Sequence, residues 1–155
     1  MRRTEWLVTA LLVAGLAGCG GMADGDGMAK PPAPMAQRTS LYDRLGGMPA
    51  IEAVTDTFLQ NVAADPAINR RFARTDIPRL RGLLVEQLCA ATGGPCIYGG
   101  KPMPEAHKGM QITGAEFDAM GGDLAKALDA HAVPAAERDE LLKALGGMRP
   151  QIVGL

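Results

Sequence analysis

The chain has 155 residues and a formal net charge of −1, with 16 Lys and Arg against 17 Asp and Glu. This length fits one domain of ordinary size, and the balanced charge provides no basic stripe for nucleic-acid phosphates, so a nucleic-acid partner is not expected. Aromatic residues make up only 4% of the chain, which predicts an aliphatic, helical core in which a cofactor fills the space that aromatic side chains do not.

The first segment has the pattern of an export signal. Arg2 and Arg3 precede the apolar run WLVTALLVAGLAG, which is short for a membrane span and leads into LAGC, ending at Cys19. This tetrapeptide resembles a bacterial lipobox, in which a peptidase cleaves before a cysteine that carries a diacylglyceryl group. We therefore expect a signal peptide at 1–18 and an exported lipoprotein, anchored to a membrane through Cys19 and facing the periplasm or the cell exterior. A plain secretory signal and an uncleaved anchor are the alternatives.

The next segment is predicted to be a tether. Residues 19–39 comprise the lipidated cysteine and a stretch rich in Gly, Pro and small residues, without hydrophobic periodicity. The folded domain is accordingly expected to span residues 40–155.

Two helices are predicted at the start of this domain. Ser40 caps a short helix in LYDRLGG, which Gly46 and Gly47 end because glycine accepts the positive φ of a C-terminal cap. A second helix begins at Pro49 and stops at Asp65, which a proline follows. Its apolar face is predicted to carry Ile51, Val54, Phe58 and Val62.

A third helix is predicted from Asp76, its cap, to the glycines at 93 and 94, with Pro78 in the first turn. Its apolar ridge consists of Leu80, Leu84 and Leu88. An irregular stretch that contains several Gly and Pro residues follows, through Pro104.

Two more helices are predicted in the last third of the chain. Thr113 caps a helix over 114–133, with Glu116 three residues on as in a capping box. A last helix follows Pro134 and is bent or broken by a Gly-Gly pair and Pro150. No segment alternates over the length of a strand, so the fold class is predicted to be all-α.

Cys89 and Cys96 flank AATGGP, a tight turn that can bring two α-carbons within disulfide range. Export would expose them to an oxidising compartment, so we expect a bridge; two buried free thiols are the alternative. A pair with this spacing and no neighbouring ligands is a poor zinc signal.

Five stretches carry a family resemblance: SLYDRLGGMPAIEAVTDTF, RFARTDIPRLRGLLVEQL, ATGGPCIYGGKPM, HKGMQITGAEFDAM and DAHAVPAAERDELL. Their order and spacing resemble the group I truncated haemoglobins, two-over-two helical globins of bacteria, algae and protozoa. The likeness covers residues 40–153 and includes the paired glycines that are a signature of this family. It implies a two-over-two helical sandwich around a haem.

The resemblance implies that His107 is the proximal ligand of the iron of haem b, because it stands four residues after the PM dipeptide. Neutral imidazole suits iron, and its other ring nitrogen is expected to donate to a backbone carbonyl. A satisfied core histidine is the alternative. His131, at a helix end before a proline, is interpreted as a capping or solvated residue.

The resemblance also implies a lined pocket. Phe72 is expected to pack flat on the porphyrin, and Thr75 and Arg79 to pair with its propionates, whereas Arg81 and Lys108 read better as ordinary surface charges. The remaining predicted cofactor contacts are Phe58, Leu59, Leu80, Leu84, Leu88, Met103, Ile112, Phe117 and Met120.

The sequence departs from many relatives at two distal positions. Where they carry a tyrosine and a glutamine that donate hydrogen bonds to bound oxygen, this chain has Leu59 and Leu84. The predicted function is therefore reversible binding of oxygen or another diatomic gas in an apolar distal pocket on a five-coordinate ferrous iron. The alternative is a nitric oxide dioxygenase that depends on a separate reductase. A haem-free adaptor is a third possibility, which His107 and Phe72 disfavour.

Overall fold

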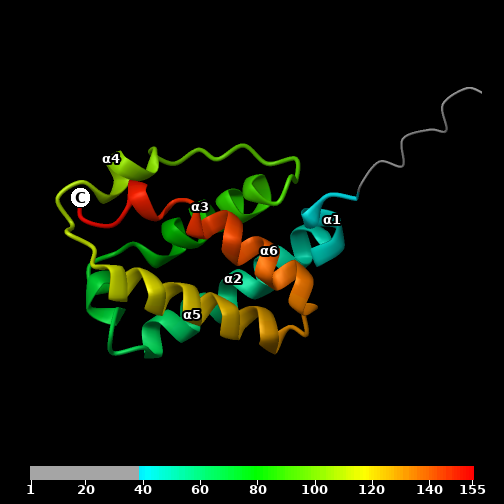
Figure 1. The fold of residues 1–155 in the computed structure, drawn as a ribbon, viewed down its shortest axis with the longest axis horizontal. Coiled ribbons are helices and arrows are strands. Elements are labelled where there is room, and N and C mark those ends of the chain that lie inside the picture. The colour runs from blue at the N-terminus through cyan, green and yellow to red at the C-terminus, as the bar shows by residue number, and fades with distance from the viewer. Residues whose placement is uncertain (1–38) are drawn as a thin grey trace, which may run out of the picture. The chain divides into compact units, whose positions relative to one another are not determined.

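The computed structural model describes residues 39–155, which form a bundle of helices (Figure 1). The signal peptide predicted at 1–18, the lipidation of Cys19 and all but the last residue of the predicted linker lie outside the described residues. The elements are α1 Leu41–Leu45, α2 Gly47–Ala64, the 3-10 helix η1 Asn69–Phe72, α3 Ile77–Ala91, α4 Met103–His107, α5 Gly114–Ala130, α6 Ala135–Gly146 and the 3-10 helix η2 Arg149–Gln151. In this part of the chain the only β-type pairing is a single parallel bridge between Ile112 and Val153.

The first corner is set by local hydrogen bonds and one glycine. The Ser40 hydroxyl accepts from the backbone N–H of Asp43 at 3.1 Å, and the Asp43 carboxylate accepts from the N–H of Ser40, which completes a capping box. Gly46, with φ of +103°, ends α1 and begins α2. A residue with a side chain is strained at this φ, so the corner requires glycine. α2 starts at Gly47, two residues before the predicted Pro49.

The caps predicted for α3 and α5 are confirmed. The Asp76 carboxylate accepts from the N–H of Arg79 at 3.1 Å, and Thr113 and Glu116 form the second capping box. α3 ends at Ala91, slightly before the predicted glycines, and Gly93 follows with a φ of +80°. The carbonyl of its C-cap residue, Thr92, accepts from the N–H of Tyr42 in α1 at 2.9 Å. At Gly94 a Cβ would come within 2.6 Å of the Tyr42 ring and 2.7 Å of the Cys89 sulfur, so only glycine fits.

One more boundary and two short helices differ from the prediction. α5 ends at Ala130 rather than near 133, since Ala132 has a φ of +54°. The short helices η1 and α4 lie in segments for which no helix was predicted. Each spans about one turn, which is too short to show hydrophobic periodicity. The predicted break of the last helix is confirmed, because α6 stops at Gly146 and η2 contains Pro150.

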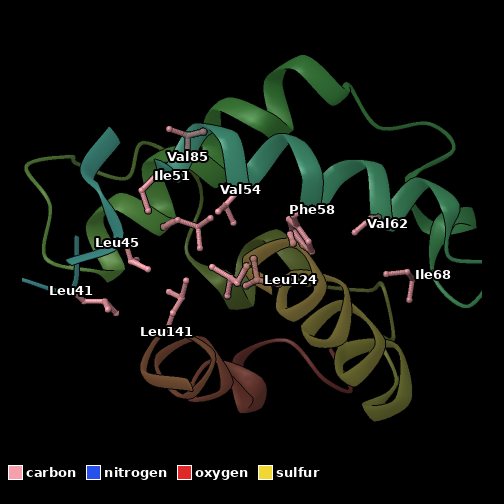
Figure 2. Close-up of a cluster of buried hydrophobic side chains, with 13 residues drawn as sticks. Leu41, Leu45, Ile51, Val54, Phe58, Val62, Ile68, Val85, Leu124 and Leu141 are labelled. Atoms are coloured by element: carbon pink, nitrogen blue, oxygen red, sulfur yellow. The ribbon is translucent and has the colours of Figure 1, made fainter. Parts of the chain in front are cut away.

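The four longer helices pack as two pairs, α2 with α3 and α5 with α6. α2 lies against α3 and, most extensively, against α5, while α6 contacts α5, α3 and α1. Figure 2 shows the buried cluster between α2 and the α5 and α6 helices. Phe58, 3% exposed, is its only aromatic side chain, and the other members are Leu41, Leu45, Ile51, Val54, Val62, Ile68, Val85, Leu88, Leu124, Ala127, Leu128 and Leu141. The core is therefore aliphatic, as the composition predicts.

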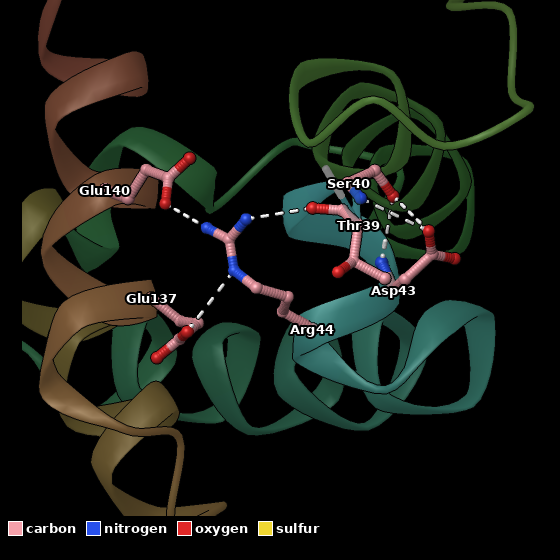
Figure 3. A network of polar contacts seen from close by, with 6 residues as sticks. All are labelled: Thr39, Ser40, Asp43, Arg44, Glu137 and Glu140. Carbon is pink, nitrogen blue, oxygen red and sulfur yellow. Dashed lines mark hydrogen bonds and ion pairs between the residues drawn. The ribbon is translucent and has the colours of Figure 1, made fainter. Parts of the chain in front are cut away.

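A polar network joins α1 to α6 (Figure 3). The Arg44 guanidinium pairs with Glu137 at 3.3 Å and with Glu140, and it donates to the Thr39 carbonyl at 3.0 Å. Since Arg44 is partly exposed, each of these ion pairs contributes at most about 1 kcal/mol. Across residues 39–155, no helix combines the length and the apolar composition needed to cross a membrane.

Candidate functional site

His107 is the last residue of α4, and one hydrogen bond orients its ring. Its Nδ1 lies 2.9 Å from the carbonyl oxygen of Met103, one turn earlier in the same helix. A carbonyl oxygen can only accept, so Nδ1 carries the proton of this bond, and in the neutral form of the ring the lone pair then lies on Nε2. The side chain is half-buried. This is the arrangement in which a neutral imidazole binds a metal ion while a backbone carbonyl holds its tautomer.

Most of the predicted cofactor contacts are neither fully buried nor fully exposed. They are large apolar side chains that remain half-buried, whereas the core residues are under 10% exposed. These half-buried residues are Leu59 on α2, Phe72 at the end of η1, Leu80 and Leu84 on α3, Met103 on α4, Ile112 before α5, and Phe117 and Met120 on α5. Phe72, Leu84 and Met120 pack on the edge of the buried cluster. The exposed part of each of these side chains is apolar area that a flat apolar group could cover.

Two predicted contacts, Phe58 and Leu88, lie deeper. Each is 3% exposed within the buried cluster. Leu88 also lines a small apolar cavity with side chains of α1, α2, α5 and α6. Both residues thus belong to the core that supports the half-buried apolar surface.

Gln87, which the sequence offers with Gln60 and Tyr98 only as an alternative donor to a bound gas, lies beside two methionine side chains. Its side-chain Nε2 lies 3.2 Å from the sulfur of Met148 and 3.8 Å from the sulfur of Met103. A thioether is a weak acceptor, so this amide is poorly satisfied. The available signal was its position seven residues after Leu80, on the face of α3 that carries the apolar ridge.

The polar residues considered as partners of the haem propionates fall into two groups. Thr75, whose N–H donates to the Phe72 carbonyl at 3.0 Å, and Arg79 are exposed, as is Lys108. Arg81 is engaged elsewhere: it pairs with Asp56 of α2 at 2.9 Å, and this hydrogen bond lowers the pKa of the Asp56 carboxyl. Arg81 therefore matches its interpretation as an ordinary surface charge.

His131 has a different setting from His107. It is exposed at the C-terminal end of α5, where its Nε2 lies 2.8 Å from the hydroxyl of Thr57. This geometry agrees with the interpretation of His131 as a helix-end residue.

The cysteines predicted to pair are bonded in the structure. The α-carbons of Cys89 and Cys96 are 5.7 Å apart, and the bridge links the end of α3 to the loop that leads toward α4. The described residues contain no group of three or more His, Cys, Asp and Glu side chains placed to hold a metal ion.

Comparisons with known proteins agree with this architecture. The family of bacterial-like globins matches residues 40–153. Group 1 truncated hemoglobin GlbN of Mycolicibacterium paratuberculosis is 41% identical over 117 residues, which cover 76% of this chain and 86% of that protein. The GlbN protein of a Nostoc species is 35% identical over 115 residues, which cover 74% of this chain and 98% of the relative.

Solved structures show the same fold. The Fe(III) form of truncated hemoglobin from Tetrahymena pyriformis has a TM-score of 0.73 at 34% identity and covers 75% of this chain and 99% of its own. The 2/2 hemoglobin of a Synechococcus species, in the cyanomet state with covalently attached heme, has a TM-score of 0.70 at 28% identity. The match covers 74% of this chain and 98% of that protein. Together with the helical pairs and the placement of His107, these matches show that the chain belongs to the group 1 truncated haemoglobins and has their all-α, two-over-two globin fold.

Proposed function

We propose that this truncated haemoglobin holds haem b through Nε2 of His107 and reversibly binds oxygen or another diatomic gas. The observation that carries the proposal is the 2.9 Å contact between Nδ1 of His107 and the Met103 carbonyl, which leaves Nε2 as the free lone pair. When bound, ferrous haem supplies an iron with an open coordination position for the gas.

In this proposal the apolar residues expected to line the haem have a separate task, which is to hold the tetrapyrrole and exclude water. Phe72 and Met120 offer half-buried apolar surface from η1 and α5, and Met103 does so from α4. At about 25 cal/mol per Å², covering such surface with a large flat cofactor contributes several kcal/mol to its retention. Thr75 and Arg79, which are both exposed, are the proposed partners of the propionates.

The distal residues set the strength of gas binding. Leu59 and Leu84 carry no hydrogen-bond donor, so the pocket favours apolar, weakly hydrogen-bonding diatomic ligands. The rival function, oxidation of nitric oxide with electrons from a separate reductase, predicts nitrate as a product. Nitrate formation from the oxygenated protein and nitric oxide, sustained over many turnovers by an added reductant, would favour the enzyme over the carrier.

Substitution of the proposed ligand tests the haem site directly. We expect His107→Ala to abolish stable haem incorporation, measured by the Soret absorbance of the purified protein, while most helical content remains because the apolar surface is intact. The matched control is His131→Ala, which removes the other histidine and is expected to retain haem. Normal haem occupancy in His107→Ala would overturn the assignment.

The export signal and anchor belong to the same proposal. Arg2 and Arg3, the apolar run and LAGC support a signal peptide at 1–18, lipidation of Cys19 and a linker to residue 39, ahead of a globin domain over 40–155. The Cys89–Cys96 bridge supports an oxidising compartment, because disulfides persist in exported proteins and are rare in the cytosol. The protein would then act at a membrane surface facing the periplasm or the cell exterior.

A further inference from the structure

The helix that carries His107 is weakly held by its own structure. α4 has five residues, and its N-cap residue, Pro102, makes no side-chain cap hydrogen bond. In the segment that follows, Gly109 has a φ of +79° and Gln111, which has a side chain, a φ of +49°. A segment with two residues in the left-handed region needs contacts from other parts of the fold to hold a single backbone conformation.

Arg71, in η1, supplies such contacts. Its Nη1 donates to the carbonyl of Met110 at 2.8 Å, while Nε and Nη2 donate to the two carboxylate oxygens of Glu116 at 2.7 and 3.0 Å. The planar guanidinium therefore joins the segment after His107 to the first turn of α5 with a bidentate, charge-assisted pair.

Glu116 fixes the other end of the segment. Its carboxylate also accepts from the backbone N–H of Thr113 at 2.8 Å and from the Thr113 hydroxyl at 2.9 Å. These bonds, above all those from Arg71, lower the pKa of Glu116 to about 2, so the carboxylate stays ionised at neutral pH. The C-terminus adds two backbone contacts: the N–H of Gln111 donates to the carbonyl of Leu155 at 2.5 Å, and the N–H of Gly154 donates to the carbonyl of Ile112 at 2.9 Å.

We propose that Arg71 and Glu116 are positioning residues for the iron ligand: they clamp residues 108–113 and thereby hold His107 at one angle to the haem. The proposal rests on the proposed function of His107. The Arg71 side chain is 40% exposed, and an ion pair at that exposure contributes little to global stability. Its loss is therefore expected to loosen this segment while the fold persists. Arg71 directly precedes Phe72, so the clamp also ties the proposed porphyrin contact of η1 to the ligand segment.

The test compares haem-reconstituted wild-type protein with Arg71→Gln and Glu116→Gln. Three readouts report on the ligand: the iron–histidine stretching frequency of the ferrous, gas-free protein by resonance Raman, amide hydrogen exchange over residues 108–113, and the rate of haem transfer to excess apomyoglobin. We expect a shifted and broadened iron–histidine band, faster exchange in this segment, and haem loss faster by about three- to tenfold. The double variant should lose haem no faster than Arg71→Gln, since the two residues act as one unit.

The matched control is Arg138→Gln. Arg138 also bonds two carboxylates, those of Asp129 at 2.8 Å and Asp139 at 3.0 Å, but it lies on α6. It should leave all three readouts at their wild-type values.

Two outcomes separate the clamp from the proposed function. If both variants fold and bind haem with the wild-type iron–histidine band and exchange rates, the clamp is overturned while the haem proposal stands. If Arg71→Gln fails to fold, Glu116→Gln decides, because the glutamine can still accept from Thr113 and so keeps the α5 cap. If the wild-type protein takes up no haem, the function proposal fails, and exchange over 108–113 in the haem-free variants still tests the clamp itself.

Discussion

At the two distal positions the chain presents the branched side chains of Leu59 and Leu84, one from α2 and one from α3. Bound dioxygen on ferrous haem has superoxide character, so it is stabilised by donors that carbon monoxide hardly uses. A hydrogen bond to such a charged group is worth about 1.5 to 3 kcal/mol, and about 1.4 kcal/mol corresponds to a tenfold change in rate. In the proposed function, the identity of these two side chains would therefore control how long oxygen stays bound.

We predict that oxygen release is fast in the wild-type protein and that Leu59→Tyr combined with Leu84→Gln slows it at least about tenfold. Stopped-flow ligand replacement measures both rates. Carbon monoxide release is the internal control and should change much less. Slow release in the wild-type protein would contradict an apolar pocket and point to another donor, for which Gln87 is the first candidate because its amide contacts only methionine sulfurs.

Glu116 provides a test by titration. Its pKa is lowered from an ordinary value of 4.5 to about 2, chiefly by the hydrogen bonds from Arg71 and then by those from Thr113. A carboxyl with a depressed folded-state pKa stabilises the native state fully above its unfolded value, and that contribution is lost as the pH falls from about 4.5 toward 2. We predict that the carboxyl resonance of Glu116 in NMR titrates with a midpoint near pH 2 in the wild-type protein. In Arg71→Gln this midpoint should rise toward the ordinary pKa of 4.5. A wild-type midpoint near the ordinary value would show that the Arg71–Glu116 pair does not form in solution.

Among the elements, α3 is the one with a covalent restraint at its end. Cys89 is fully buried there, and its bridge to Cys96 closes a loop of eight residues counted inclusively from a sequence separation of 7. Loop-closure entropy predicts that such a bridge stabilises the fold by roughly 2.5 kcal/mol. We predict that a reductant lowers the free energy of unfolding by about this amount in urea titrations. Cys96→Ser should show the same loss without reductant and no further loss with it. An unchanged midpoint on reduction of the wild-type protein would mean that the thiols are free.

The elements also show which helices a sequence can predict. The three longest helices, α2, α3 and α5, appear within a few residues of the predicted bounds. Their apolar faces are local patterns, and α3 and α5 also begin at side-chain caps. η1 and α4 were not predicted, because one turn carries no periodicity. The missed α4 holds His107, so the family resemblance rather than the local pattern identified that residue.

On the scale of the whole molecule, the proposed anchor decides where the globin domain acts. We predict that Cys19→Ser releases the protein from membranes in a bacterial host, because the acyl chains depend on that sulfur and each buried methylene contributes about 0.8 kcal/mol. Fractionation of cells that express the wild-type and variant proteins measures the distribution, with Cys96→Ser as a control that leaves the lipobox intact. A Cys19→Ser variant that stays entirely membrane-bound after removal of its signal would contradict lipid anchoring.

The sequence by itself determined the features that depend on neighbouring residues. The caps at Ser40, Asp76 and Thr113, the glycine corner at 46 and the break of the last helix follow from hydrogen bonds and φ angles within four residues. The ordered motifs also identified the family, and the family resemblance identified the proposed iron ligand.

Only the tertiary structure decided the long-range contacts of residues 108–113 and of Gln87. Arg71 meets Glu116 across 45 residues, Gln87 reaches Met148 across 61, and Ile112 pairs with Val153 near the C-terminus. No local pattern marks such partners, because a surface arginine or glutamine has the same sequence context whether it faces solvent or a distant carbonyl. These contacts arise only when α2, α3, α5 and α6 have packed, and the apolar burial that drives this packing is non-directional.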